Sequence, residues 1–197
     1  MLVFVKEGLV FLSVPKTGTS AFEAALGPMA GVVVRDPPEL KHAPLYRYDR
    51  FFRPIFEKVC GTTPETLAVI REPLSWLGSW YRYRQRPFTR GKPVSTHGIS
   101  FDTFVEGYLQ GQRPAFADVG SQARFVSPRP SGAAVDHLFR YERLELLSDF
   151  LEARLGERIE LPVRNVSPEG TLSLSPALER RLRRKHAEDF ELWERLG

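Results

Sequence analysis

The sequence predicts an α/β protein, a single domain in which helices flank a central, mainly parallel β-sheet. Short apolar runs rich in β-branched residues alternate with segments of helical spacing, as in proteins built on a parallel sheet. The length of 197 residues is close to the usual domain size, so one domain over 1–197 is expected. Hydrophobic residues make up 42% and charged residues 26%, which excludes disordered and collagen-like chains.

The first elements form a P-loop-like unit of strand, loop and helix. Residues 2–5 and 9–14 have the composition of two short strands. The turn Lys6-Glu7-Gly8 between them offers a glycine where positive φ is needed. Pro15 ends the second strand, and helical spacing follows over 18–26. This arrangement predicts a phosphate site at the start of the helix.

The same signals continue along the chain. Pro73 occupies the first helical position of one helix. Ser175, placed to cap, and Pro176 in the first turn mark the start of the last helix. Residues 85–100 are rich in Arg, Pro, Gly and Thr and are expected to form a surface loop that could act as a lid. The expected strands are 31–34, 67–70 and 136–140, and the expected helices are 48–58, 73–81, 101–109, 142–155 and one that begins near Ser175-Pro176.

Composition also bounds the compartment and the partners. The single cysteine, Cys60, cannot form an internal disulfide, which fits a reducing compartment. Lys6 and Glu7 interrupt the apolar N-terminal stretch, so no signal peptide is expected, and no run approaches the roughly 20 apolar residues of a membrane span. We therefore expect a cytoplasmic protein. The net charge of +4 favours anionic ligands, while the basic run near the C-terminus predicts a solvated helix face rather than nucleic-acid binding.

The segment Pro15-Lys16-Thr17-Gly18-Thr19-Ser20 has the chemistry of an anion site. A loop between strand and helix presents backbone N–H groups and the positive end of the helix dipole, and Lys16 adds a charge. The ATP-type loop requires Gly-x-x-x-x-Gly-Lys-[Ser/Thr], whereas lysine here precedes the glycine. The order points away from an ordinary kinase or GTPase. A glycine-containing helix start with incidental polar residues is the plain alternative.

A second group of polar residues follows the strand 67–70. Arg71 lies where the strand ends, which is where ligands bind in open α/β sheets. Ser75 and Ser79 share one face of the next helix, so either could point toward Arg71. A guanidinium beside a hydroxyl suits a second phosphate. In isolation, an arginine at a strand end beside a structural serine would explain the pattern equally well.

Together the two segments resemble the PAPS-dependent sulfotransferase family, and in particular its bacterial and carbohydrate-type branch. That family carries Pro-Lys-[Ser/Thr]-Gly-Thr after the first core strand, then Arg-x-Pro with a serine eight residues past the arginine, and this chain has both in order. Residues 161–167 and 135–144 are similar to that branch with less specificity. The Arg-Lys-Gly donor loop of the cytosolic small-molecule branch is absent, so the adenine contacts are not predicted.

The resemblance implies a role for each site residue. PAPS would be the donor, with no metal, and a saccharide or bacterial metabolite the acceptor. Lys16 and His42 would be catalytic, with Lys16 beside the leaving oxygen and His42 as the base that removes the acceptor proton. Donor binding would involve Pro15, Lys16, Thr17, Gly18, Thr19, Ser20, Arg71, Ser79 and Arg164. His97 in the possible lid is a rival base, whereas His137 and His186 have the positions of strand and helix residues.

Other functions fit part of the same pattern. A nucleotide kinase with a divergent loop would need a magnesium-binding carboxylate at a strand end, and the sequence shows no clear one. A nucleotide-binding protein that lost catalysis would keep the donor site, and a basic nucleic-acid binder would show steep salt dependence. Arg84, Arg86, Arg90 and Lys92 suggest an acidic acceptor, although a solvated loop has the same composition. The acceptor and the oligomeric state are not predicted.

Overall fold

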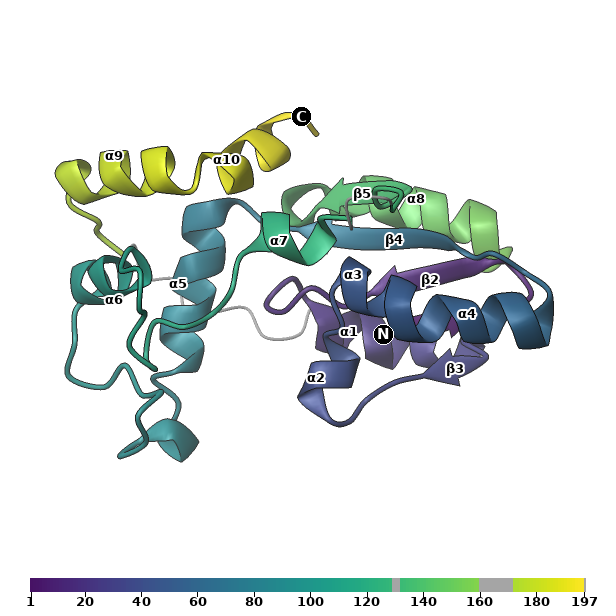
Figure 1. Cartoon of the computed structure of the whole chain (residues 1–197), viewed down its shortest axis with the longest axis horizontal. Coiled ribbons are helices and arrows are strands. Elements are labelled where there is room, and N and C mark those ends of the chain that lie inside the picture. The colour runs from purple at the N-terminus through teal and green to yellow at the C-terminus, as the bar shows by residue number, and fades with distance from the viewer. Residues whose placement is uncertain (129–131, 160–171, 197) are drawn as a thin grey trace. The chain divides into compact units, whose positions relative to one another are not determined.

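The structure, a computed structural model, describes residues 1–128, 132–159 and 172–196. The chain divides into two compact units: a sheet unit (1–71, 122–165 and 196–197) and a helical unit (72–121 and 166–195). All strands of the described residues lie in the sheet unit (Figure 1). The chain predicted as one domain over 1–197 thus contains two compact units. Within the described ranges, every helix is too short or too polar to traverse a lipid bilayer.

A mixed sheet with the strand order β3-β1-β2-β4-β5 forms the sheet unit. Strands β2, β4 and β5 are parallel, whereas β1 is antiparallel to both β2 and β3. The α/β class is confirmed, with parallel pairing confined to three strands. Because only residues 5–8 join β1 to β2, the two strands form a hairpin, in which Gly8 has the predicted positive φ of 60°. The strands are β1 (Leu2–Phe4), β2 (Leu9–Leu12), β3 (Val32–Val33), β4 (Glu65–Ile70) and β5 (His137–Arg140).

One face of the sheet is packed against helices α1 (Thr19–Leu26) and α8 (Leu144–Leu155). Successive strand side chains alternate between faces, so every second residue of the central strands enters this core. Helix α1 is too short to be stable alone, and the burial of Phe22 and Leu26 holds it in place. The core residues are Leu2, Phe4, Leu9, Phe11, Phe22, Leu26, Leu67, Val69, Leu147, Leu151 and Ile159.

An irregular helix runs from residue 45 to residue 60, across the other face of the sheet (Figure 1). Its turns alternate between α and π geometry, which confirms the irregular helix predicted for 48–58. Pro54 explains part of this irregularity, because proline lacks an N–H and its ring clashes with the carbonyl four residues earlier. Gly61, with φ of 64°, ends the helix. The segments are α3 (Leu45–Arg47), a π-helix (Tyr48–Phe52), α4 (Arg53–Ile55) and a second π-helix (Phe56–Cys60).

The helical unit packs four helices around its own aromatic core. Pro73 occupies the first turn of α5 and Ser100 caps α6, as their residue types favour. The single C-terminal helix predicted from Ser175-Pro176 is instead two helices. The chain breaks at His186, whose carbonyl accepts a hydrogen bond from the Asp189 N–H that starts the second one. The helices are α5 (Pro73–Tyr83), α6 (Phe101–Tyr108), α9 (Pro176–Lys185) and α10 (Ala187–Glu194).

Several short helical turns carry too few residues for a periodic signal and were not predicted. One of them, α7, begins at Gln122, whose side chain bonds to the backbone of Arg71. They are the helices α2 (Pro38–Lys41) and α7 (Gln122–Val126), and the 3₁₀ turns Gly27–Met29, Pro87–Thr89 and Tyr141–Arg143.

Arg84 organises the loops of the helical unit. Its side chain is buried, and the guanidinium donates hydrogen bonds to the carbonyls of Ala115 (2.8 Å) and Asp118 (2.8 Å). Its own carbonyl accepts hydrogen bonds from the Thr96 N–H (3.1 Å) and the Thr89 hydroxyl (2.6 Å). Burial lowers the pKa of Arg84 from its usual value, and the nearby Asp118 partly offsets this. Arg84 therefore joins two loops, and its burial does not fit the acceptor contact suggested for it.

Arg84→Met is expected to lower the free energy of unfolding by about 2–3 kcal/mol, because it removes the two charged hydrogen bonds from the buried guanidinium to the carbonyls of Ala115 and Asp118. Arg90→Met is the matched control: Arg90 is exposed, and the change should stay within about 0.5 kcal/mol. Urea unfolding of both variants measures the difference. Equal midpoints for the two would contradict the role given to Arg84.

Candidate functional site

The candidate site lies at the carboxyl edge of the three parallel strands in the sheet unit. Parallel strands end at the same edge, so the segments after β2, β4 and β5 are brought together there. These segments are the loop from Ser13 to Gly18, then Arg71, and then Tyr141. In open α/β sheets this edge is the usual position for a ligand. The sequence predicted the first two segments as parts of one site.

The loop after β2 adopts a compact shape that a local hydrogen bond stabilises. The Thr17 hydroxyl is buried and donates to the carbonyl of Val14 (2.9 Å). Since this uses its only proton, Thr17 could donate to a bound anion through its backbone N–H rather than its side chain. Lys16 and Gly18 both have positive φ, of 70° and 83°. A lysine in this conformation is uncommon outside turns and functional sites.

Helix α1 begins at Thr19 without a side chain to cap it. The N-cap residue of α1 is Gly18, which has no side chain. The Gly18 carbonyl accepts hydrogen bonds from the N–H groups of Ala21 (2.8 Å) and Phe22 (3.2 Å). The first N–H groups of a helix have no partner within the helix, and an anion is a suitable one. Thr19 is half-buried and Ser20 is exposed at this end.

Gly18 allows the loop to approach Tyr141 closely. A Cβ atom at residue 18 would lie 3.1 Å from Cε2 of Tyr141, which is tighter than most Cβ contacts in proteins. The Arg71 guanidinium also lies over the ring of Tyr141, with its Cζ 4.7 Å from the centre of the ring. Tyr141 therefore touches both sequence-predicted motifs. The position of Tyr141 directly after a parallel strand was the signal that could have identified it.

Arg71 is held at its backbone by Gln122. The Arg71 N–H donates to Oε1 of Gln122 (2.8 Å), and Nε2 of Gln122 donates to the Arg71 carbonyl (2.7 Å). Gln122 is 2% exposed, so its amide is committed to this pair of bonds. The backbone of Arg71 is thereby fixed just after β4. No local signal in the sequence could have identified Gln122, because it lies 51 residues from its partner.

His42 lies beside the same loop. Its Nδ1 is 2.7 Å from the carbonyl oxygen of Ser13. Because a carbonyl only accepts hydrogen bonds, Nδ1 carries the proton and Nε2 of the neutral ring has the free lone pair. Burial lowers the pKa of His42, the hydrogen bond to Ser13 opposes this, and the charge of Lys41 lowers it further. His42 is thus neutral near pH 7, with Nε2 able to accept a proton.

An ion-pair cluster holds the segment before His42 against helix α1. Glu23 of α1 pairs with Lys41 (2.8 Å) and with Arg35 (2.8 Å). Burial alone would raise the pKa of Glu23, but the hydrogen bonds from Lys41 and Arg35 outweigh it and the pKa is lowered. Lys41 directly precedes His42, so the cluster and the Ser13 hydrogen bond together position the imidazole.

The other predicted residues lie elsewhere. Ser79 is buried in α5 of the helical unit, and its partnership with Arg71 stays a prediction. His97, the rival base, is exposed in that unit. Arg164 lies outside the described residues.

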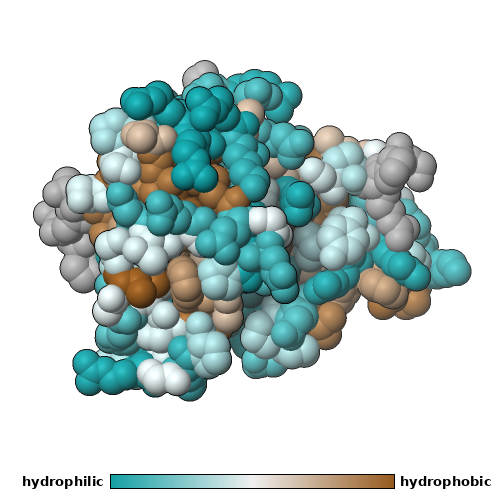
Figure 2. Space-filling model, turned by 60° about the vertical axis from the view of Figure 1, so that its left-hand side comes forward, coloured by the Kyte–Doolittle hydropathy of each residue, from teal (hydrophilic) through white to brown (hydrophobic). Residues whose placement is uncertain are grey.

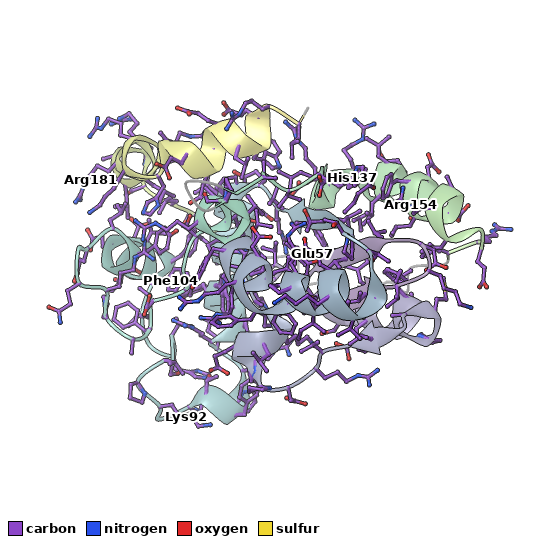
Figure 3. The ribbon with its side chains drawn as sticks, turned by 45° about the vertical axis from the view of Figure 1, so that its right-hand side comes forward. Glu57, Lys92, Phe104, His137, Arg154 and Arg181 are labelled. Atoms are coloured by element: carbon purple, nitrogen blue, oxygen red, sulfur yellow. The ribbon has the colours of Figure 1, made fainter. Side chains whose placement is uncertain are left out.

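His137 is at the opposite, amino edge of the strands. It starts β5 and contacts Glu65 (2.9 Å), which also pairs with Arg154 (2.9 Å); Figure 3 labels His137 and Arg154. The interpretation of His137 as a strand residue is confirmed, and His186 lies between α9 and α10.

Comparison with known proteins adds no relative: no protein-family model, curated protein or solved structure matches this chain.

Proposed function

We propose that this chain is a sulfotransferase that moves a sulfuryl group from PAPS to the hydroxyl of a saccharide or a bacterial metabolite. The observation that carries the proposal is the position of His42. Its neutral imidazole is hydrogen-bonded to Ser13, beside a strand-to-helix loop of the kind that binds anions. A base beside a loop that can bind an anion suits transfer of a charged group to a hydroxyl. The resemblance of the two sequence motifs names that group as a sulfuryl group.

In the proposed reaction, the acceptor oxygen forms a bond to sulfur while the bond from sulfur to the bridging phosphate oxygen breaks. Nε2 of His42 takes the proton of the acceptor hydroxyl. Adenosine 3′,5′-bisphosphate leaves with the electron pair of the broken bond, and the Lys16 ammonium neutralises the charge that develops on it. Positioning and electrostatic stabilisation supply the acceleration in reactions of this type.

The residues at the strand edge fit a donor with two separate anionic groups. The uncapped start of α1, with Lys16, suits the 5′-phosphosulfate end. Arg71 suits the 3′-phosphate, because its backbone is fixed by Gln122 and its guanidinium lies over the ring of Tyr141. A guanidinium presents its N–H donors in one planar fork, the geometry that phosphate oxygens accept. The donor roles of Ser79 and Arg164 rest on the sequence resemblance alone.

A ligand-dependent melting temperature tests the donor. Adenosine 3′,5′-bisphosphate at 100 times its dissociation constant should stabilise the protein by about 2.7 kcal/mol. For a chain of this size, we expect the melting temperature to rise by roughly 5–10 °C, and ATP with magnesium should raise it much less. Arg71→Gln should abolish most of the shift, whereas Arg90→Gln should leave it unchanged. A larger shift with ATP and magnesium than with the bisphosphate would refute the proposed donor.

A further inference from the structure

A second positively charged site lies within the helical unit. Arg181, Arg184 and Lys185 of α9 line a cavity of about 290 Å³ together with Leu109, which follows α6. Residues three and four apart on a helix share one face, so the three cations are directed to the same side of α9. Figure 3 labels Arg181 on α9, and the upper part of the surface in Figure 2 is largely hydrophilic. The cavity volume is close to the lower limit for small-molecule pockets.

Among the residues that the structure describes, the arginines of this cavity differ from the neighbouring Arg183 in their ion pairing. Arg183 pairs with Glu179 (3.0 Å), approaches Glu194 (3.9 Å) and lies 4.5 Å over the ring of Phe190. Within the described ranges, Arg181 and Arg184 form no ion pair, and the cavity lining includes no acidic side chain. Among the described residues, carboxylates therefore compensate Arg183 but neither arginine of the cavity.

Lys185 gives the cavity a fixed wall. Its ammonium donates a hydrogen bond to the carbonyl of Leu109, which anchors the end of α9 to the end of α6. The favourable effect of cations on the C-terminus of a helix would explain a basic last turn in general. It does not explain why three cations line one cavity on the same face of α9. Like charges three and four residues apart lower helix stability by about 0.2–0.5 kcal/mol per pair. A bound anion would remove that repulsion.

We propose that this cavity, named here the α9 cavity (Leu109, Arg181, Arg184 and Lys185), binds a tetrahedral oxyanion, namely a sulfate or phosphate group. Two guanidinium groups and one ammonium match its oxygens, because arginine presents paired N–H donors in a fork and lysine adds a point charge. The group could be a free ion or an ester on a small molecule. This site is separate from the proposed donor site and does not depend on it.

The test measures affinity by calorimetry at constant ionic strength. The probes are sodium sulfate, sodium phosphate, a sulfated disaccharide, the same disaccharide without sulfate, and a short DNA duplex. Arg181→Gln/Arg184→Gln removes two charges from the α9 cavity, and Arg180→Gln/Arg183→Gln removes two from the same helix outside it. We expect the first variant to bind the tetrahedral oxyanion at least tenfold more weakly, and the control to change by less than twofold. Circular dichroism confirms that both are folded, and the single variants Arg181→Gln and Arg184→Gln replace the double if it is not.

Each result decides the proposal. Binding of the sulfated disaccharide without binding of the free ions identifies an ester ligand, and equal binding of free ions identifies a free anion. An equal loss in the cavity and control variants would mean diffuse charge attraction and would overturn the proposal. So would unchanged affinity in the cavity variant, which would place the anion elsewhere, or an absence of binding by all sulfate and phosphate probes. Strong binding of a short DNA duplex alone would also overturn it in favour of nucleic acid.

Discussion

Replacing His42 with asparagine is expected to lower turnover by roughly 10²–10⁴-fold, the usual contribution of a general base. Asparagine is the sharpest choice because its side-chain amide can still donate to the carbonyl of Ser13, as Nδ1 of His42 does. The loop beside it should therefore keep its shape, while the proton acceptor at Nε2 is lost. The release of adenosine 3′,5′-bisphosphate from PAPS, with a mixture of mono- and disaccharides as acceptors, measures the effect.

The control is donor binding, which should be retained because His42 is assigned to the acceptor. The His42→Asn variant should show the same melting shift with adenosine 3′,5′-bisphosphate as the unchanged protein. Near-normal turnover in this variant would show that His42 is not the base. A loss of both turnover and bisphosphate binding would assign it to the shape of the donor loop instead.

The lowered pKa of His42 also predicts the pH dependence of the reaction. The base is active when neutral, so turnover should remain high below pH 6.5 and fall only as the pH passes below the depressed pKa. Stability changes in the same direction. The fold favours the neutral ring, so this contribution is complete above the unfolded pKa of about 6.5 and is lost as the pH falls through the folded pKa. An acid limb of the turnover profile above pH 6.5 would contradict this assignment.

Lys16→Met is expected to lower turnover by about 10²–10³-fold, the effect of removing one group that stabilises charge on a leaving or attacking oxygen. Methionine retains the Cβ and an unbranched stem, so the strain of the positive φ at residue 16 is the same in both proteins. The variant should remain folded, with a melting temperature close to that of the unchanged protein.

Lys16→Arg separates charge from geometry. Arginine restores the charge but on a wider, planar group, and we expect it to recover donor binding better than turnover. If Lys16→Met retained full turnover, Lys16 would not act on the leaving oxygen. Activity in Lys16→Met and none in His42→Asn would confine the catalytic role to the imidazole.

Features that depend on a few neighbouring residues were predictable from the sequence. The hairpin of β1 and β2, the positive φ of Gly8 and the start of α5 at Pro73 follow from the conformational limits of glycine and proline. The irregularity of the helix around Pro54 has the same origin. In contrast, the single helix predicted after Ser175 is broken at His186, where the end of one helix and the start of the next depend on packing rather than on local propensity.

The sequence by itself therefore determined the strand–loop–helix unit around Lys16 and Gly18, and the presence of an arginine at the end of β4. Only the tertiary structure decided that the ring of His42 bonds to Ser13, that Gln122 fixes Arg71, and that Tyr141 contacts both Gly18 and Arg71. The physical reason is the range of the forces. Backbone sterics and helical periodicity act within a few residues, whereas contacts between distant segments depend on how the whole apolar core packs. Tertiary packing also set the state of the proposed base, because the burial that lowers the pKa of His42 arises only in the folded chain.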